Sequence, residues 1–87
     1  MGVIKHFSRE EIVVYAPRNF GEVRYAADEL KLGKPALINI GLLTPEERIW
    51  AIHFLNGVVY AVDGQSREIG NRVFLFCPPN VSVSMGV

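Results

Sequence analysis

One stretch in the middle of the chain constrains the fold most tightly. Thr44 is a favoured N-cap, Pro45 fits the first helical position, and Glu47 stands three residues after the cap. This combination is typical of the start of an α-helix. We expect the helix to run to about Asn56 and to end at Gly57, because glycine readily adopts the conformation that closes a helix.

Apolar side chains surround this helix on nearly every side. Counting ~100° per residue from Ile49, Trp50 lies at ~100°, Phe54 at ~140°, Leu55 at ~240° and Ile52 at ~300°. A helix that packs on one sheet needs only an apolar stripe. The pattern therefore predicts a second neighbour for this helix.

A first helix and a preceding strand are expected nearer the amino terminus. Residues 11–16 (EIVVYA) are β-branched and aromatic and are followed by Pro17, which is typical of a strand. Asn19 is a good N-cap, and Glu22 is placed to reach back to its amide, as in a capping box. The predicted helix has one apolar face and is closed by Gly33. That face consists of Val23, Ala26, Ala27 and Leu30.

The rest of the chain reads as strands joined by turns. Asp63-Gly64 and Gly70-Asn71 are turn signals. The predicted strands are 35–40, 58–62, 66–69 and 72–77, and an edge strand at 81–85 is a further candidate.

This order predicts an α/β (α+β) two-layer sandwich with a mixed sheet of about five strands. A right-handed crossover places the first helix on one face of the sheet, and the second joins it there. Residues 1–10 are interpreted as a lead-in and 11–87 as the globular domain. The runs 58–62 (VVYAV) and 73–77 (VFLFC) do not alternate, so both faces of those strands require cover. Self-association would provide it, and the alternative is that the lead-in or the tail folds over the bare face.

Composition excludes several classes of function. Nine Lys and Arg balance nine Asp and Glu, and no basic cluster is present, which argues against nucleic-acid binding. The single cysteine, Cys77, cannot form an internal disulfide and fits a reducing, cytoplasmic compartment. No signal peptide and no run of about 18 apolar residues is found.

The sequence also lacks the parts of a reaction centre. No GxGxxG or GxxxxGK[ST] pattern occurs, and no nucleophile is placed beside a base. His53 and His6 have no second ligand in view, whereas a metal site needs three or four. We therefore expect no enzyme activity, no cofactor and no metal.

Several segments together resemble the carboxy-terminal core of SepF proteins over residues 11–84. The family shows a strand ending in Asn-Leu, a helix ending in Asp-Phe-Leu-x-Gly, then Tyr-Ala, a glycine turn, Ile-Gly and Phe-Leu-x-x-Pro. The matching positions are Asn39-Ile40, Phe54-Leu55-Asn56-Gly57, Tyr60-Ala61, Gly64, Ile69-Gly70, Phe74-Leu75 with Pro78, and Asn80-Val81, preceded by Pro17 and Asn19-Phe20-Gly21-Glu22.

The resemblance implies a cytoplasmic division adaptor at the inner face of the cell membrane. Such a protein forms homodimers and higher polymers and binds the carboxy-terminal tail of FtsZ. The family attaches to the membrane through an amino-terminal amphipathic helix and a linker, for which residues 1–9 are too short. Membrane contact is therefore expected only through a segment absent from this chain. The alternative function is a small metabolite-binding or regulatory α/β domain.

The resemblance also suggests site residues. For the FtsZ tail they are Tyr60, Arg67, Glu68, Val73 and Phe74, and for self-association they are Ile49, Trp50, Phe54 and Gly57. Phe74 is equally well explained as strand core. Trp50 and His53 stand where the family usually has Arg and Asp; the change at Trp50 makes the helix more apolar and suggests a different or tighter helix–helix contact. Glu68, next to Arg67, stands where a basic residue is common, and this weakens a direct transfer of the binding mode.

Overall fold

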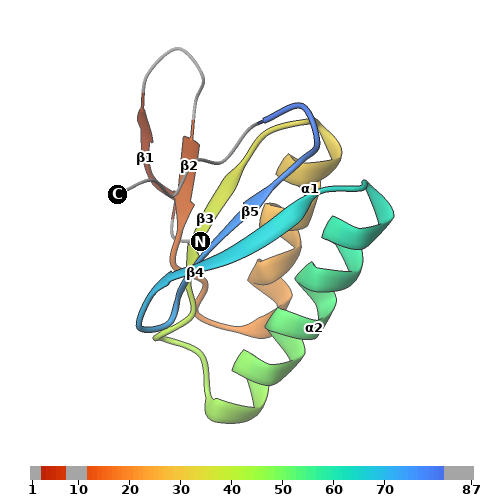
Figure 1. The fold of residues 1–87 in the computed structure, drawn as a ribbon. Coiled ribbons are helices and arrows are strands. Elements are labelled where there is room, and N and C mark those ends of the chain that lie inside the picture. Colours follow the sequence, from red (N-terminus) through yellow and green to blue (C-terminus); the bar gives the residue numbers. More distant parts are fainter. Residues whose placement is uncertain (1–2, 8–11, 82–87) are drawn as a thin grey trace.

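The computed structural model describes residues 3–7 and 12–81, which form two layers, a mixed sheet and a pair of helices (Figure 1). The sheet has five strands in the order β1-β2-β3-β5-β4. The strands are β1 (Val3–Phe7), β2 (Ile12–Tyr15), β3 (Ala36–Asn39), β4 (Gln65–Gly70) and β5 (Val73–Cys77); the helices are the 3₁₀ turn η1 (Phe20–Val23), α1 (Arg24–Lys31) and α2 (Pro45–Ala61).

Strand directions explain why both helices share one face. β2 and β3 are parallel, whereas β5 is antiparallel to both β3 and β4. β3 and β4 therefore also run in parallel. The crossovers through α1 and α2 move across the sheet in the same direction, and right-handed crossovers place both on the same side. Figure 1 shows this arrangement, and the predicted fold class is confirmed.

The core lies between this face of the sheet and the helices. Ala36 and Ile38 of β3 and Phe76 of β5 are fully buried there. α1 contributes its predicted apolar face, and α2 contributes a stripe of three residues one turn apart. That stripe is Ala51, Leu55 and Val59. Alternation along β3 leaves Leu37 half-buried on the other face of the sheet.

Both predicted helix starts are present, with one difference in detail. Thr44 and Glu47 form a complete capping box at the start of α2. The Asn19 side chain accepts a hydrogen bond from the Glu22 amide (3.1 Å). The Glu22 carboxylate, however, accepts from the amide of Arg18 at 2.9 Å, not from Asn19 as predicted. The first turn is accordingly a 3₁₀ turn before α1 begins.

The predicted end of the second helix at Gly57 and the strand at 58–62 are wrong. α2 continues through both to Ala61. The reason is packing: Val59 lies one turn after Leu55 and is buried on the same stripe, and burial of this kind outweighs the low helix propensity of glycine and valine. The residue with a left-handed backbone conformation after the helix is Asp63, whose φ is 60°.

The remaining boundaries follow the sequence within one or two residues. The strands predicted at 11–16, 35–40, 66–69 and 72–77 are β2 to β5. The fifth strand is β1, which pairs with β2 and lies in the stretch left unassigned from sequence. The turn predicted at 70–71 lies at 71–72, where Arg72 has φ 63. The candidate strand at 81–85 lies, apart from Val81, outside the described residues.

Replacement of Gly57 by alanine tests the continuous helix. In the described part of the chain, no atom lies within 4 Å of a Cβ added at Gly57, so Gly57→Ala should raise the free energy of unfolding by about 1 kcal/mol. Gly33→Ala is the matched control and should lower it, because Gly33 has φ 83. Thermal unfolding of the two variants gives both values. A destabilised Gly57→Ala protein would mean that the helix ends there.

Candidate interaction surfaces

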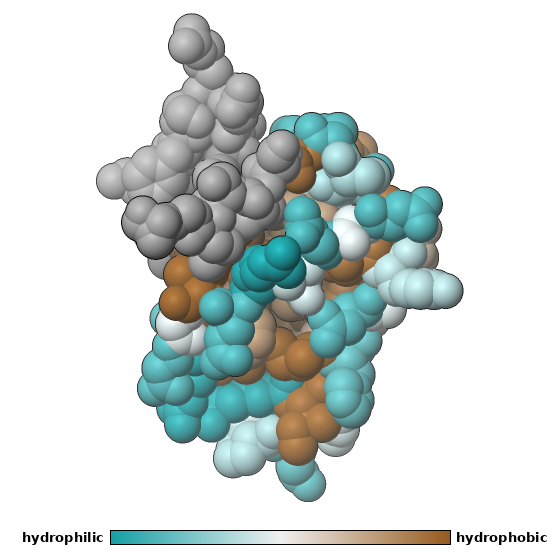
Figure 2. Space-filling model, in the orientation of Figure 1, coloured by the Kyte–Doolittle hydropathy of each residue, from teal (hydrophilic) through white to brown (hydrophobic). Residues whose placement is uncertain are grey.

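The outward side of α2 is apolar and in contact with water. Ile49 is 57% exposed, Trp50 52% and Tyr60 85%. We call this surface the α2 crest and define it as Ile49, Trp50, His53, Phe54, Gly57 and Tyr60. Figure 2 shows hydrophobic patches exposed at the molecular surface and separated by hydrophilic residues. The sequence prediction that apolar residues surround this helix is confirmed.

The α2 crest contains no Asp, Glu, Lys or Arg. Between Arg48 and Asp63 the sequence has no acidic or basic residue other than His53. By helical geometry His53, Gly57 and Tyr60 lie opposite the buried stripe. Gly57 leaves the helix backbone open at the centre of this surface. A second helix could therefore approach closely without meeting a like charge.

Phe20 borders the α2 crest and packs against two of its aromatic rings. Its ring lies 5.9 Å from that of Trp50 and 6.0 Å from that of Phe54, both in edge-to-face geometry. Each such aromatic pair stabilises a fold by roughly 0.5–1.5 kcal/mol in addition to the effect of burying its apolar area. Sequence reasoning did not connect Phe20 with this surface, because it precedes Trp50 by a whole helix and strand.

The carboxylate of Glu47 holds Phe20 in this place. One oxygen accepts a hydrogen bond from the amide of Thr44 (3.1 Å) and the other from the amide of Phe20 (3.2 Å). These two backbone donors stabilise the charged form and lower the pKa of Glu47 below its usual value. One side chain thus joins the start of α2 to the turn that begins the first helix.

The second candidate surface is the face of the sheet turned away from the helices. Val14, Leu37 and Leu75 are adjacent there by strand register. All three are half-buried, so this face is less open than the sequence predicted. Arg67 of β4 lies opposite Leu75 and adds a cation at the edge of the sheet.

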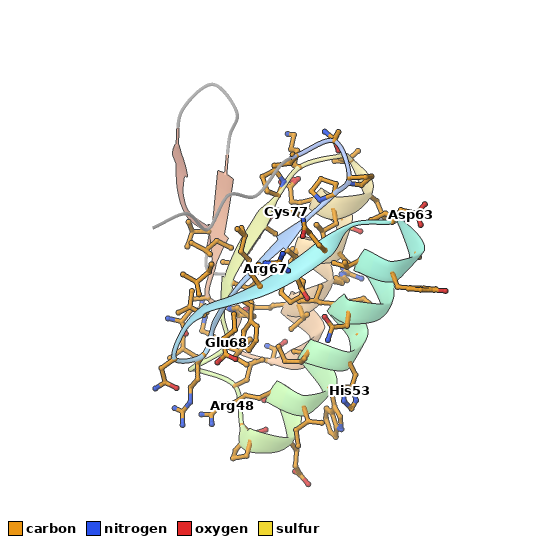
Figure 3. The ribbon with its side chains drawn as sticks, in the orientation of Figure 1. Arg48, His53, Asp63, Arg67, Glu68 and Cys77 are labelled. Carbon is orange, nitrogen blue, oxygen red and sulfur yellow. The ribbon has the colours of Figure 1, made fainter. Side chains whose placement is uncertain are left out.

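The predicted partner-binding residues do not line one groove in a single subunit. Glu68 lies opposite Phe74 across β4 and β5, on the face that the helices cover. Arg67 and Val73 lie on the other face, and Figure 3 shows Arg67 and Glu68 on neighbouring positions of β4. Tyr60 belongs to α2 and not, as expected, to a strand.

Phe74 is shared between core and surface. It is half-buried, packs against the hydrophobic core and stacks on Phe76 with the ring centres 6.3 Å apart. This position fits both interpretations that the sequence left open. The predicted self-association residues, in contrast, lie together on the α2 crest.

Cys77, the possible metal ligands and Arg48 are the remaining polar and ionisable features of the described domain. Cys77 is buried, and burial raises the pKa of its thiol. Among residues 14–81, no three His, Cys, Asp or Glu side chains are gathered as metal ligands would be. Arg48 donates from Nη2 to the carbonyl of Gly41 (3.4 Å), while its buried Nε has no hydrogen-bond partner among the described atoms.

The fold and these surfaces define a small α+β domain with an uncharged apolar helix face in water. The family model described as "Cell division protein SepF" matches residues 12–83. The chain belongs to the SepF family of cell division proteins. No helix within the described part of the chain is long and apolar enough to cross a bilayer.

Individual relatives agree with this assignment. The chain is 36% identical over 74 residues to a cell division protein SepF of Alkaliphilus oremlandii, covering 85% of this chain and 51% of that protein. A SepF of Synechococcus sp. is 38% identical over the same length, which is 85% of this chain and 39% of the relative. The chain therefore spans only about half or less of these two proteins.

Solved structures show the same fold. A SepF-like protein from Archaeoglobus fulgidus superposes with a TM-score of 0.75 at 16% identity, covering 85% of this chain and 92% of that one. A SepF-like protein from Pyrococcus furiosus gives 0.72 at 16% identity, covering 82% and 89%.

The lowered pKa of Glu47 predicts a pH-dependent contribution to stability. Its folded pKa lies below the unfolded value, so the contribution is present above the ordinary carboxyl pKa and is lost as pH falls through the folded pKa. The difference in unfolding midpoint between the wild type and Glu47→Gln should be largest near pH 7 and should shrink toward pH 3. Glu46→Gln, in the same helical turn, is the control. A difference that stays constant over this range would contradict the role given to Glu47.

Proposed function

We propose that this domain is a non-enzymatic division adaptor that self-associates through the α2 crest and binds the carboxy-terminal tail of FtsZ. In this proposal it acts in the cytoplasm, at the division site on the inner face of the membrane, and supports assembly or anchoring of the FtsZ ring. Membrane contact is made by a segment other than the described domain. The observation that carries the proposal is the uncharged apolar surface of α2.

The size of the α2 crest supports association of modest strength. A whole aromatic side chain accounts for about 150–250 Å². The exposed fractions of Trp50 (52%), Phe54 (38%) and Tyr60 (85%) then leave ~260–440 Å² of aromatic surface in water. A standard interface buries about 800 Å² per partner. The crest thus forms the centre of an interface, to which Ile49, 57% exposed, adds aliphatic surface.

The α2 crest and the outer face of the sheet lie on opposite sides of the molecule. Use of both surfaces would join dimers into larger assemblies, because the two contacts do not compete for the same atoms. The half-buried state of Leu37 and Leu75 makes the sheet face the weaker of the two. The homodimer through α2 is therefore the primary unit in this proposal.

For tail binding we propose the region of β4 and β5. β4 is an edge strand, paired only with β5 within the described sheet, and an extended peptide can add to such an edge through main-chain hydrogen bonds. Arg67 and Glu68 would select the charge pattern of the tail, and Phe74 and Val73 would supply apolar contact. Tyr60 points outward from α2, so in this proposal it contacts a tail bound at β4 and β5 only where a second subunit forms part of the binding site.

Assembly and tail binding would reinforce each other. An extended, disordered tail loses conformational freedom on docking, so each site binds weakly. Several adaptor subunits held together meet several FtsZ tails along a polymer, and the linked sites raise the overall affinity. A dimer through α2 is the smallest unit with this property.

Replacement of Gly57 by lysine should block self-association while the fold is retained. An added Cβ meets no described atom within 4 Å, so the side chain can be attached without a clash at its base, and it places a charge and extra volume in the centre of the α2 crest. Light scattering over a concentration series should show the wild type associating and Gly57→Lys remaining monomeric. Gly57→Ala is the control with little added volume. A wild type that is strictly monomeric at every concentration would contradict self-association.

Calorimetric titration with an FtsZ carboxy-terminal peptide tests the binding region. Arg67→Glu, at an exposed position, and Phe74→Leu, which preserves most of the core volume, should each weaken binding about tenfold, or about 1.4 kcal/mol. Leu32→Ala is the control, since Leu32 is 71% exposed and follows α1. Equal affinity for the wild type and both variants would exclude this region as the binding site.

A further inference from the structure

We propose that His53 makes self-association through the α2 crest sensitive to pH, with the neutral histidine favouring association and the protonated form opposing it. The inference rests on the self-association proposed above and adds its regulation. It follows from where His53 stands in the helix and from which groups surround it.

His53 is the central residue of α2. It lies eight residues after Pro45 and eight before Ala61, the two ends of the helix. Figure 3 shows its side chain on the side of α2 turned away from the sheet, where it is exposed. Ile49 and Gly57 lie one turn before and after it on the same side. A titratable group therefore stands at the middle of an otherwise uncharged apolar surface.

Symmetry then brings this residue close to its own copy. Homodimers are predominantly two-fold symmetric, and residues on the axis meet themselves. In an antiparallel pair of α2 helices that cross at their centres, the axis passes beside residue 53. In a parallel pair every residue faces its equivalent. Either arrangement places two His53 side chains side by side, and Gly57 allows the backbones to approach closely there.

Few charges are placed to compensate two protonated histidines. Glu46 lies on the same side of α2 but seven residues away, ~10 Å along the axis at 1.5 Å per residue, and in the antiparallel pair it lies opposite Tyr60 of the second copy. Asp63 lies beyond the end of the helix. Both lie farther from His53 than the ~8 Å over which physiological salt screens charges.

The elements packed against α2 also leave His53 without a facing charge. They are η1, α1, β4 and β5. α1, β4 and β5 meet α2 on the side of its buried stripe, whereas Phe20 of η1 contacts Trp50 and Phe54 at the border of the crest. Their titratable side chains among the described residues are Glu22, Arg24, Tyr25, Asp28, Glu29, Lys31, Arg67, Glu68 and Cys77.

Protonation would therefore bury two like charges in an apolar contact, which is unfavourable. The neutral fraction of an ordinary histidine falls about tenfold between pH 7.5 and 5.5. The dissociation constant of the dimer should rise about sixfold over this range if one neutral histidine of the pair is sufficient. It should rise about a hundredfold if both are required.

The test is sedimentation equilibrium of the intact chain at pH 7.5 and 5.5, with circular dichroism to verify the fold at both values. The dissociation constant of the wild-type dimer should be at least about sixfold higher at pH 5.5 than at pH 7.5. His53→Gln should associate at both pH values without this shift, and His53→Arg should associate weakly at both. His6→Gln is the matched control and should retain the wild-type shift, because it removes the other histidine of the sequence.

The outcomes separate this inference from the proposed function. A wild type that dimerises equally well at both pH values, or a shift that persists in His53→Gln, overturns the role of His53 and leaves self-association intact. A wild type that stays monomeric at both values at the highest concentration overturns self-association and this inference with it.

Discussion

The handedness of the two crossover connections is the constraint on which the rest of this structure depends. Because β2-α1-β3 and β3-α2-β4 cross the sheet in the same direction, α1 and α2 must share one face. α1 lies beside β3, and α2 covers β4 and β5. The chain has no third described helix to lie over α2. One side of α2 fills the core and the other side remains in water, whatever residues it carries.

Glu47 shows how a local motif can acquire a tertiary role. A capping box needs only one carboxylate oxygen for the N-cap amide, and the second oxygen here accepts a bond from Phe20, 27 residues earlier. Phe20 in turn packs against Trp50 and Phe54. The same group that starts α2 thereby fixes an aromatic ring beside the α2 crest, so the edge of that surface is ordered by the helix start.

Local signals in the sequence predicted much of the fold, and contacts distant in sequence account for what they missed. The caps at Asn19 and Thr44 and the left-handed Gly33 were predicted because each depends on residues within one turn. Gly57 misled the prediction, since the burial of Val59 beside Leu55 is decided by the sheet below and not by the neighbouring sequence. The exposed residues of α2 were predicted from helical periodicity. The placement of Tyr60 was missed because it depends on where the helix ends. The hydrogen bond between Glu47 and Phe20 was missed because it is a contact across the domain. A single sequence specifies neither.

The central glycine of α2 links stability to assembly. Glycine inside a helix costs about 1 kcal/mol relative to alanine, a substantial share for a domain of 87 residues. Among the described residues, no atom lies within 4 Å of a Cβ added at Gly57, so packing within this part of the chain does not require a glycine there. A second helix laid across the α2 crest would gain close backbone approach at that point, flanked by the apolar side chains of Ile49 and Tyr60. The self-association proposed above would give the destabilising glycine and the uncharged surface around it one common physical explanation.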